Sequence, residues 1–148
     1  MDDNPTTLPQ PPAPQVWPTL RAADALTLIR FLVDVVGFEE TAVFADGSTV
    51  QHAQLSWPLG GGIMLGSARP DPDDAWPLQP GTFGAYVVVD DPDARYRRIV
   101  AAGADITQEL HDSDHGSRDF AIRDPEGNHW SFGTYRGEPR VATTDPEH

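Results

Sequence analysis

The sequence DALTLIRFLVDVVG occupies residues 24–37, and DDPDARYRRIVAAG occupies residues 90–103. Each stretch begins with an aspartate that can cap a helix, continues for about three turns with apolar residues on one face, and ends at a glycine. Asp24 and Gly37 are 13 positions apart, as are Asp90 and Gly103, and the two stretches are offset by 66 residues. The pattern therefore predicts two capped amphipathic helices within an internal repeat.

Strand-like segments surround both predicted helices. A short apolar run precedes each capping aspartate, LRAA at residues 20–23 and YVVV at residues 86–89. Three further runs follow each helix, separated by turn sequences rich in glycine, proline and aspartate. They are residues 38–45, 50–57 and 62–67 in the first copy, and residues 105–109, 117–123 and 129–135 in the second. The order βαβββ thus occurs twice, which predicts an α+β fold.

The repeat also sets the expected domain boundaries. We expect a single domain over residues 16–136, with a first module at about 16–67, a linker loop at 68–82 and a second module at about 83–136. The flanking residues 1–15 and 137–148 lack apolar periodicity, and we expect both to be disordered tails. The linker loop is long for a compact domain and contains Trp76, and loops of this kind often cover a binding site.

Composition restricts the partners of the chain. Its 148 residues include ten arginines, no lysine and no cysteine, and the net charge is −13. A surface this acidic repels phosphate backbones and attracts cationic small molecules, so we expect no nucleic-acid partner. No apolar run is long enough for a membrane span, and the N-terminus lacks the basic and apolar segments of a signal peptide. We therefore expect a cytoplasmic protein with no membrane contact and no disulfides.

The last strand pair carries a family resemblance. RDFAIRDPEGNHWSF, at residues 118–132, is similar to the final hairpin of vicinal oxygen chelate proteins, the glyoxalase/bleomycin resistance protein/dioxygenase superfamily. The segments HAQL at 52–55 and GIMLG at 62–66 resemble the third and fourth strands of that family's first unit, and GFE at 37–39 resembles its helix exit. The resemblance covers about residues 16–136. It implies two βαβββ modules whose mostly antiparallel, mixed sheets form a cup.

The resemblance also implies where a metal ion would bind. Metal-dependent members of the superfamily carry histidine, glutamine or glutamate on the first and last strands of each unit. Matching by motif places Trp17, Met64, Gly84 and Ser131 at these positions. Such side chains are not the usual ligands of magnesium, manganese, zinc, nickel or iron. We therefore expect no bound metal and no other cofactor.

Strand alternation predicts which side chains line the cup. If Ser131 faces the cup then His129 does too, and the apolar Ala53 and Leu55 leave His52 on the cup side of their strand. His52 and His129 are candidates for a general base or for an unusual divalent metal site, and polar lining is the alternative. The complete expected ligand-binding cup comprises Trp17, Thr19, Arg21, His52, Gln54, Met64, Gly84, Tyr86, His129 and Ser131.

Another polar cluster falls in a predicted turn. It has no standard ligand spacing, so we interpret it as a solvated loop. Its members are His111, Asp112, Asp114 and His115. The adjacent Arg118 could bind an anion through two N–H groups of its guanidinium. We favour the alternative that it pairs with a neighbouring carboxylate such as Asp119 or Asp124.

Three functions remain open at this point. The favoured one is a metal-free binding protein of the bleomycin-resistance type that holds a small aromatic or cationic compound. The second is a lyase, isomerase or dioxygenase with a divergent metal site around His52 and His129. The third is a domain whose cup has degenerated and that serves an interaction. By the resemblance we also expect a homodimer. Elemental analysis for bound metal would distinguish the first function from the second.

Overall fold

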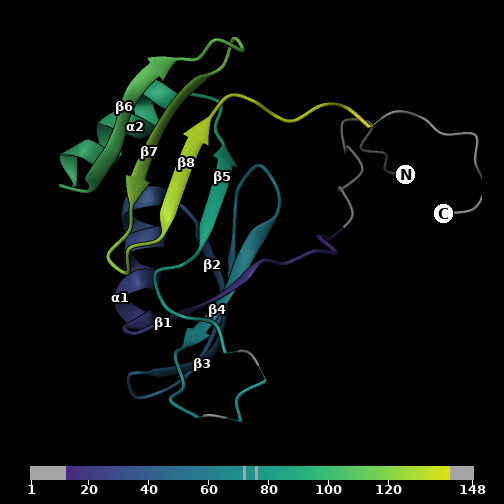
Figure 1. The fold of residues 1–148 in the computed structure, drawn as a ribbon, viewed down its shortest axis with the longest axis vertical. Coiled ribbons are helices and arrows are strands. Elements are labelled where there is room, and N and C mark those ends of the chain that lie inside the picture. The colour runs from purple at the N-terminus through teal and green to yellow at the C-terminus, as the bar shows by residue number, and fades with distance from the viewer. Residues whose placement is uncertain (1–12, 72, 76, 141–148) are drawn as a thin grey trace, which may run out of the picture. The chain divides into compact units, whose positions relative to one another are not determined.

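The computed structural model describes residues 13–71, 73–75 and 77–140. The chain divides into two compact units, Met1–Pro80 and Gly81–His148. Each unit has the predicted order βαβββ (Figure 1). Most of the two predicted tails, and Trp76 of the linker loop, lie outside the described residues. Within the described part of the chain, no helix is long and apolar enough to cross a membrane.

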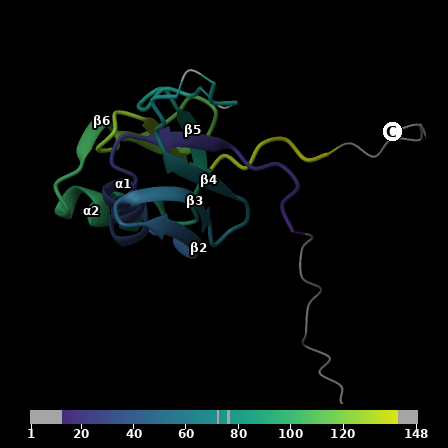
Figure 2. The ribbon, with the colours of Figure 1, turned by 90° about the horizontal axis from the view of Figure 1, so that it is seen from below.

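The first unit is a mixed four-stranded sheet with one helix. Strand order is β1-β4-β3-β2; β1 is parallel to β4 and the other pairs are antiparallel (Figure 2). Helix α1 continues directly into the π-helix η1, and α1 contacts β1, β3 and β4. The elements are β1 (Thr19–Ala22), α1 (Ala25–Arg30), η1 (Phe31–Val36), β2 (Glu39–Asp46), β3 (Thr49–Ser56) and β4 (Gly62–Ser67).

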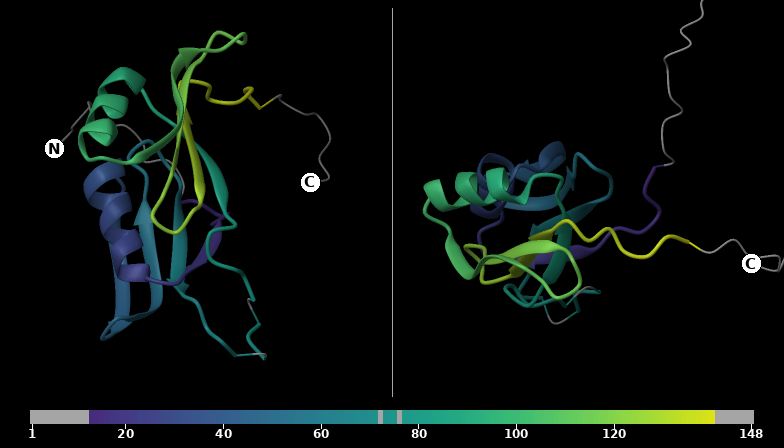
Figure 3. Two further views of the ribbon diagram at one scale, coloured as in Figure 1. Left: turned by 60° about the vertical axis from the view of Figure 1, so that its left-hand side comes forward. Right: turned by 90° about the horizontal axis from the view of Figure 1, so that it is seen from above.

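The second unit repeats this topology as β5-β8-β7-β6, with β5 parallel to β8 (Figure 3). Helix α2 contacts β6 and β7. Strand β6 runs on to Asp112, so the prediction that His111 and Asp112 lie in a turn was wrong. Their pairing with Asp119 and Arg118 extends the ladder to that point. The elements are β5 (Gly84–Val88), α2 (Pro92–Ala101), β6 (Asp105–Asp112), β7 (Arg118–Arg123) and β8 (His129–Gly133).

The two helices begin alike, but one predicted cap was wrong. Asp24 caps α1 by accepting from the Thr27 amide, as predicted. In α2 the cap is Asp91 and not Asp90, because Pro92 occupies the first helical position, which proline favours. The two capping aspartates have nearly equal backbone angles, φ −128° and ψ 81° against φ −127° and ψ 84°. The repeat offset at this end is therefore 67 residues, from 24 to 91, and not 66.

The first helix accommodates one residue more than the second. Asp24 and Gly37 are 13 positions apart, whereas Asp91 and Gly103 are 12 positions apart. The extra residue is absorbed in η1, where the Gly37 amide donates to the Leu32 carbonyl five residues back at 2.9 Å. Such π-helical segments are rare and occur mostly as single-turn bulges inside α-helices.

Alternation separates a core face from an open face on each sheet. On the core face of the first sheet Ala53 and Leu55 are fully buried, together with Leu28 of α1. In the second sheet Trp130 and Phe132 are fully buried, which confirms the predicted orientation of β8. Burying a side chain of this size contributes roughly 2–3 kcal/mol. The side chains on the opposite face of each sheet, which we call the open face, are mainly polar and partly exposed.

The DPEGN turn before β8 is held by one buried carboxylate. Asp124 accepts hydrogen bonds from the Glu126 and Asn128 amides, from Asn128 Nδ2 and from Trp130 Nε1, at 2.8–3.0 Å. Asn128 Oδ1 in turn accepts from the Phe83 amide at 3.0 Å. Asp124 is 5% exposed and Asn128 is fully buried. This network fixes the start of β8 beside β5, and so the register of the open face.

Candidate functional site

The predicted cup residues of the first unit share the open face of the first sheet. Strand register places Thr19 opposite Met64, and the Trp17 ring lies over Gly62, where an added Cβ would be 2.9 Å from Trp17 Cζ3. The Phe44 ring stacks on His52 with centroids 6.2 Å apart. The six predicted residues in this unit are Trp17, Thr19, Arg21, His52, Gln54 and Met64.

The other four predicted cup residues belong to the second unit. Register pairs Gly84 with His129 and Tyr86 with Ser131, on the neighbouring strands β5 and β8. His129 is exposed and Ser131 is half-buried. The two histidine candidates for catalysis therefore belong to different units.

A polar cleft of about 430 Å³ lies on the first unit. Three predicted cup residues, Thr19, Arg21 and His52, contribute to it, whereas Trp17, Gln54 and Met64 do not line it. Five residues of the predicted linker loop complete the cleft wall, namely Arg69, Asp71, Asp73, Asp74 and Ala75.

Arg21 and Asp74 form an ion pair at this cleft. Arg21 Nη2 lies 3.2 and 3.3 Å from the two carboxylate oxygens of Asp74, and Arg21 Nη1 donates to the Ser67 carbonyl at 3.4 Å. Both side chains are largely buried, with exposed fractions of 12% and 8%. An added Cβ at Gly66 would lie 3.4 Å from Arg21 Nη1, so the glycine leaves room for the guanidinium on the strand.

A second pocket, of about 580 Å³, lies on the second unit. In its lining, Tyr86 Oη donates to Asp119 Oδ1 at 3.0 Å and accepts from the Tyr135 amide at 3.1 Å. Ser117 Oγ donates to the other Asp119 oxygen at 2.9 Å. The lining residues are Tyr86, Ser113, His115, Ser117, Asp119, Tyr135 and Glu138.

The environment of Tyr86 keeps its phenol protonated. Burial raises the pKa of Tyr86 above its ordinary value of 10.0, and the hydrogen bond to the Asp119 carboxylate raises it further; the Tyr135 amide acts in the opposite direction. The neutral phenol therefore persists at physiological pH and remains a hydrogen-bond donor to Asp119.

Sequence reasoning missed most of this pocket. Of its lining residues, only Tyr86 belongs to the predicted cup, and His115 belongs to the cluster interpreted from the sequence as a solvated loop. It is exposed, but it lines the pocket. One feature of the sequence does point to Asp119: Gly133, the residue opposite it on the neighbouring strand, is a glycine. An added Cβ there would lie 1.8 Å from Asp119 Oδ1 and 2.3 Å from Tyr86 Oη, so the strand needs glycine where these two groups meet.

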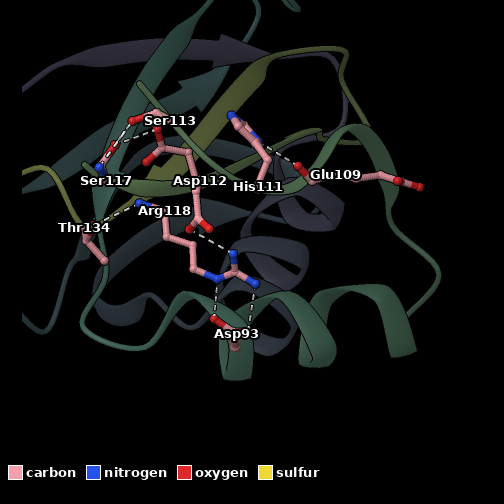
Figure 4. A network of polar contacts seen from close by, with 9 residues as sticks. Asp93, Glu109, His111, Asp112, Ser113, Ser117, Arg118 and Thr134 are labelled. Atoms are coloured by element: carbon pink, nitrogen blue, oxygen red, sulfur yellow. Dashed lines mark hydrogen bonds and ion pairs between the residues drawn. The ribbon is translucent and has the colours of Figure 1, made fainter. Parts of the chain in front are cut away.

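Arg118 has a structural role beside this pocket (Figure 4). Its Nε and Nη2 donate to the two Asp93 oxygens at 2.8 and 3.2 Å, and Nη1 donates to Asp112 at 3.0 Å. Pairing with carboxylates was predicted, but with Asp119 or Asp124, which is wrong. Helix α2 packs on β7 and brings Asp93 to the arginine. The hydrogen bonds from Arg118 lower the pKa of Asp93 below its ordinary value.

The side chains at the metal positions implied by the resemblance do not fit a metal ion. The side chains of Trp17 and Gly84 have no atom that binds a metal ion. Met64 offers only a thioether sulfur, and Ser131 a neutral hydroxyl. In the part of the chain that the structure describes, no three histidine, aspartate or glutamate side chains converge where they could hold a metal ion.

Comparisons with known proteins agree with this fold. A sequence model of the Glyoxalase/Bleomycin resistance protein/Dioxygenase superfamily matches residues 15–132. The uncharacterized protein Mb0911c of Mycobacterium bovis is 31% identical over 127 residues, which is 81% of this chain and 82% of that protein.

Solved structures give the same result. TioX from Micromonospora sp. ML1 is 32% identical, with a TM-score of 0.67 over 78% of this chain and 94% of its own. TnmS3, an antibiotic binding protein from Streptomyces sp. CB03234, is 21% identical, with a TM-score of 0.61 over 78% of this chain and 90% of its own. The chain therefore belongs to the glyoxalase/bleomycin resistance protein/dioxygenase superfamily.

Proposed function

We propose that this chain binds a small cationic compound with aromatic character, without a metal ion and without transforming it. The observation that carries the proposal is the pocket of the second unit. There, the rings of Tyr86 and Tyr135 and the carboxylates of Asp119 and Glu138 line one space. Its volume of about 580 Å³ is in the range of small-molecule sites, roughly 300–1,000 Å³.

The carboxylates are arranged to accept a positive charge. Both oxygens of Asp119 are held by hydroxyl donors, Tyr86 Oη and Ser117 Oγ, so its orientation is fixed before a ligand arrives. Glu138 accepts from Tyr135 Oη at 3.2 Å. Pre-organised groups of this kind lower the entropy lost on binding.

The tyrosines provide the complementary surface. The Tyr86 and Tyr135 rings meet edge to face, with centroids 6.5 Å apart and an interplanar angle of 73°. One ring can present its face to a cation while the other contacts a flat ligand, and cation–π contacts contribute roughly 0.5–2 kcal/mol. The net charge of −13 also raises the encounter rate with cations.

The fold alone does not choose between binding and catalysis. Its neighbours include TnmS3 and a lactoylglutathione lyase from Agrobacterium tumefaciens, which is 23% identical with a TM-score of 0.63. One is an antibiotic binding protein and the other a lyase, so the proposal depends on the chemistry of the pocket.

A fluorescence titration with 9-aminoacridine, a planar cation at neutral pH, tests the proposal. We expect saturable one-to-one binding, much weaker binding of the neutral analogue acridine, and a loss of about tenfold in Asp119→Asn, equal to about 1.4 kcal/mol. Asp105→Asn is the matched control, because it removes the same charge from the same unit at a residue outside the pocket. Equal affinities for the cation and acridine, or equal losses in the two variants, would contradict the proposal.

A further inference from the structure

The cleft of the first unit is chemically different from the pocket of the second. It gathers two of the ten arginines of this acidic chain, Arg21 and Arg69, beside His52 and Thr19. Its walls are strands on one side and the loop that carries Asp74 on the other. This cleft is not used by the function proposed above.

The contacts between Arg21 and Asp74 are longer than those between Arg118 and Asp93. A single nitrogen, Nη2, faces both Asp74 oxygens, at 3.2 and 3.3 Å. Arg118, by contrast, offers two nitrogens to the two Asp93 oxygens, the shorter contact being 2.8 Å. Charge-assisted bonds of optimal geometry are roughly 2.7–2.9 Å long and arranged as a two-pronged fork.

Burial means that Arg21 requires an anion. Its side chain is 12% exposed, and a guanidinium removed from water is strongly destabilising unless a negative group compensates it. The carboxylate that does so here comes from a loop 53 residues away in the sequence, not from a strand of the sheet. Another carboxylate of suitable size could take the place of the Asp74 carboxylate.

We propose that the first-unit cleft is a binding site for the acid group of a small organic carboxylate, with Arg21 as its recognition residue and Asp74 as a built-in competitor. Arg21 Nη1 lies next to Gly66, 3.4 Å from where a Cβ would stand, and the cleft of about 430 Å³ gives room beside it for the body of the ligand. The free ligand competes with a carboxylate that belongs to the same chain and is therefore always present at the site. Asp74 therefore weakens binding of carboxylates in the unmodified protein.

An NMR titration of the full chain with benzoate tests this site, with the neutral isostere benzamide as the matched probe. We expect Asp74→Asn to bind benzoate at least tenfold more tightly than the unmodified protein, and neither protein to respond to benzamide. In the double variant Arg21→Gln/Asp74→Asn the gain should disappear. Asp74→Ser, which also removes the carboxylate, gives the same test if Asp74→Asn is poorly folded.

Asp73→Asn is the charge control. It removes one negative charge from the same cleft, so a purely electrostatic gain would appear in it as well, whereas we expect a change of less than about twofold. No gain in either Asp74 variant, a gain that survives Arg21→Gln, or an equal gain in Asp73→Asn would overturn the proposal. Benzoate reports on Arg21 and 9-aminoacridine on Asp119, so this proposal and the proposed function can fail separately.

Discussion

The turn at residues 57–61 in the first unit and the turn at 124–128 in the second make the same backbone hydrogen bonds. The Trp57 amide donates to the Gly61 carbonyl at 2.9 Å, and the Asp124 amide donates to the Asn128 carbonyl at 3.0 Å. In the second turn the Asp124 side chain bonds the turn itself. In the first, Trp57 is buried against Phe38, with ring centroids 4.9 Å apart.

The same backbone hydrogen bonds are therefore supported by different means in the two turns. The second turn uses a buried, hydrogen-bonded carboxylate, with Gly127 at positive φ, and the first uses aromatic packing, with both Gly60 and Gly61 at positive φ. Polar networks hold one geometry because an unmade bond is strongly destabilising, whereas apolar contacts tolerate small shifts. We expect the second unit to be the more sensitive of the two to single polar substitutions.

The open faces show the same contrast. Gly66 and Gly133 occupy equivalent positions on β4 and β8, and each leaves space for a polar group on the sheet. Over Gly133 the group is the Tyr86–Asp119 pair, and both residues lie in strands of that sheet. Over Gly66 it is Arg21, whose carboxylate partner comes from the loop. The second site is thus fixed by strand register, and the first depends on the loop.

The largest expected effect is at the second turn. Asp124→Ala leaves four buried or partly buried donors without their acceptor, and we expect it to lower the free energy of unfolding by roughly 3–5 kcal/mol. Leu59→Ala in the first turn removes a side chain that is 48% exposed and should change the free energy by less than about 0.5 kcal/mol. Urea denaturation measures both, and equal losses would remove the contrast between the turns.

Substitution of the two open-face glycines, Gly133 and Gly66, should give a smaller difference in stability than substitution in the two turns. Gly133→Ala places a Cβ 1.8 Å from Asp119 Oδ1, and we expect it to destabilise the protein by about 2 kcal/mol and to abolish binding of 9-aminoacridine. For Gly66→Ala the shortest distance is 3.1 Å, to the Gln51 carbonyl, so we expect a cost of about 1 kcal/mol or less. Thermal melts and the fluorescence titration check the pair. Retained binding in Gly133→Ala would show that the Tyr86–Asp119 pair is not needed.

A smaller effect is expected in the pH dependence of protein stability that arises from Tyr86 in the second pocket. The folded-state pKa of Tyr86 is raised, so its contribution to stability is fully present below pH 10.0 and is lost as the pH rises through the raised value. Tyr86→Phe removes the group, so the melting temperatures of the variant and the unmodified protein should converge above pH 10.0. A difference that stays constant through this range would show that ionisation of Tyr86 is not coupled to folding.

The smallest expected effect is that of added metal. We expect zinc, nickel, manganese or iron to produce no saturable one-site rise in melting temperature. A native-state ligand at about 100 times its dissociation constant would add roughly 2.7 kcal/mol, which is a rise of several degrees. A clear rise that disappears in His52→Ala or His129→Ala would overturn the proposed metal-free function and favour an enzyme.

The sequence was sufficient for the fold because the signals of the repeat are local. The cap Asp24, the glycine that ends each helix and the alternation along β8 act within a few residues, and the described structure confirms them. The predicted second cap is wrong by one residue, because two aspartates stand before Pro92 and the 13-residue spacing of the first copy points to Asp90. The extra residue in η1 makes that spacing unequal in the two units.

The sequence by itself determined the two βαβββ units, the face on which β3 and β8 bury their apolar side chains, and the unsuitability of Trp17, Met64, Gly84 and Ser131 as metal ligands. Only the tertiary structure decided that Asp119 meets Tyr86, that Asp74 reaches Arg21 and that Asp93 takes Arg118. The physical reason is the separation along the sequence of the residues that interact. Helix caps and strand alternation are set by neighbouring residues, whereas these pairs join residues 25 to 53 positions apart, which only strand register, helix packing and the path of a loop bring together.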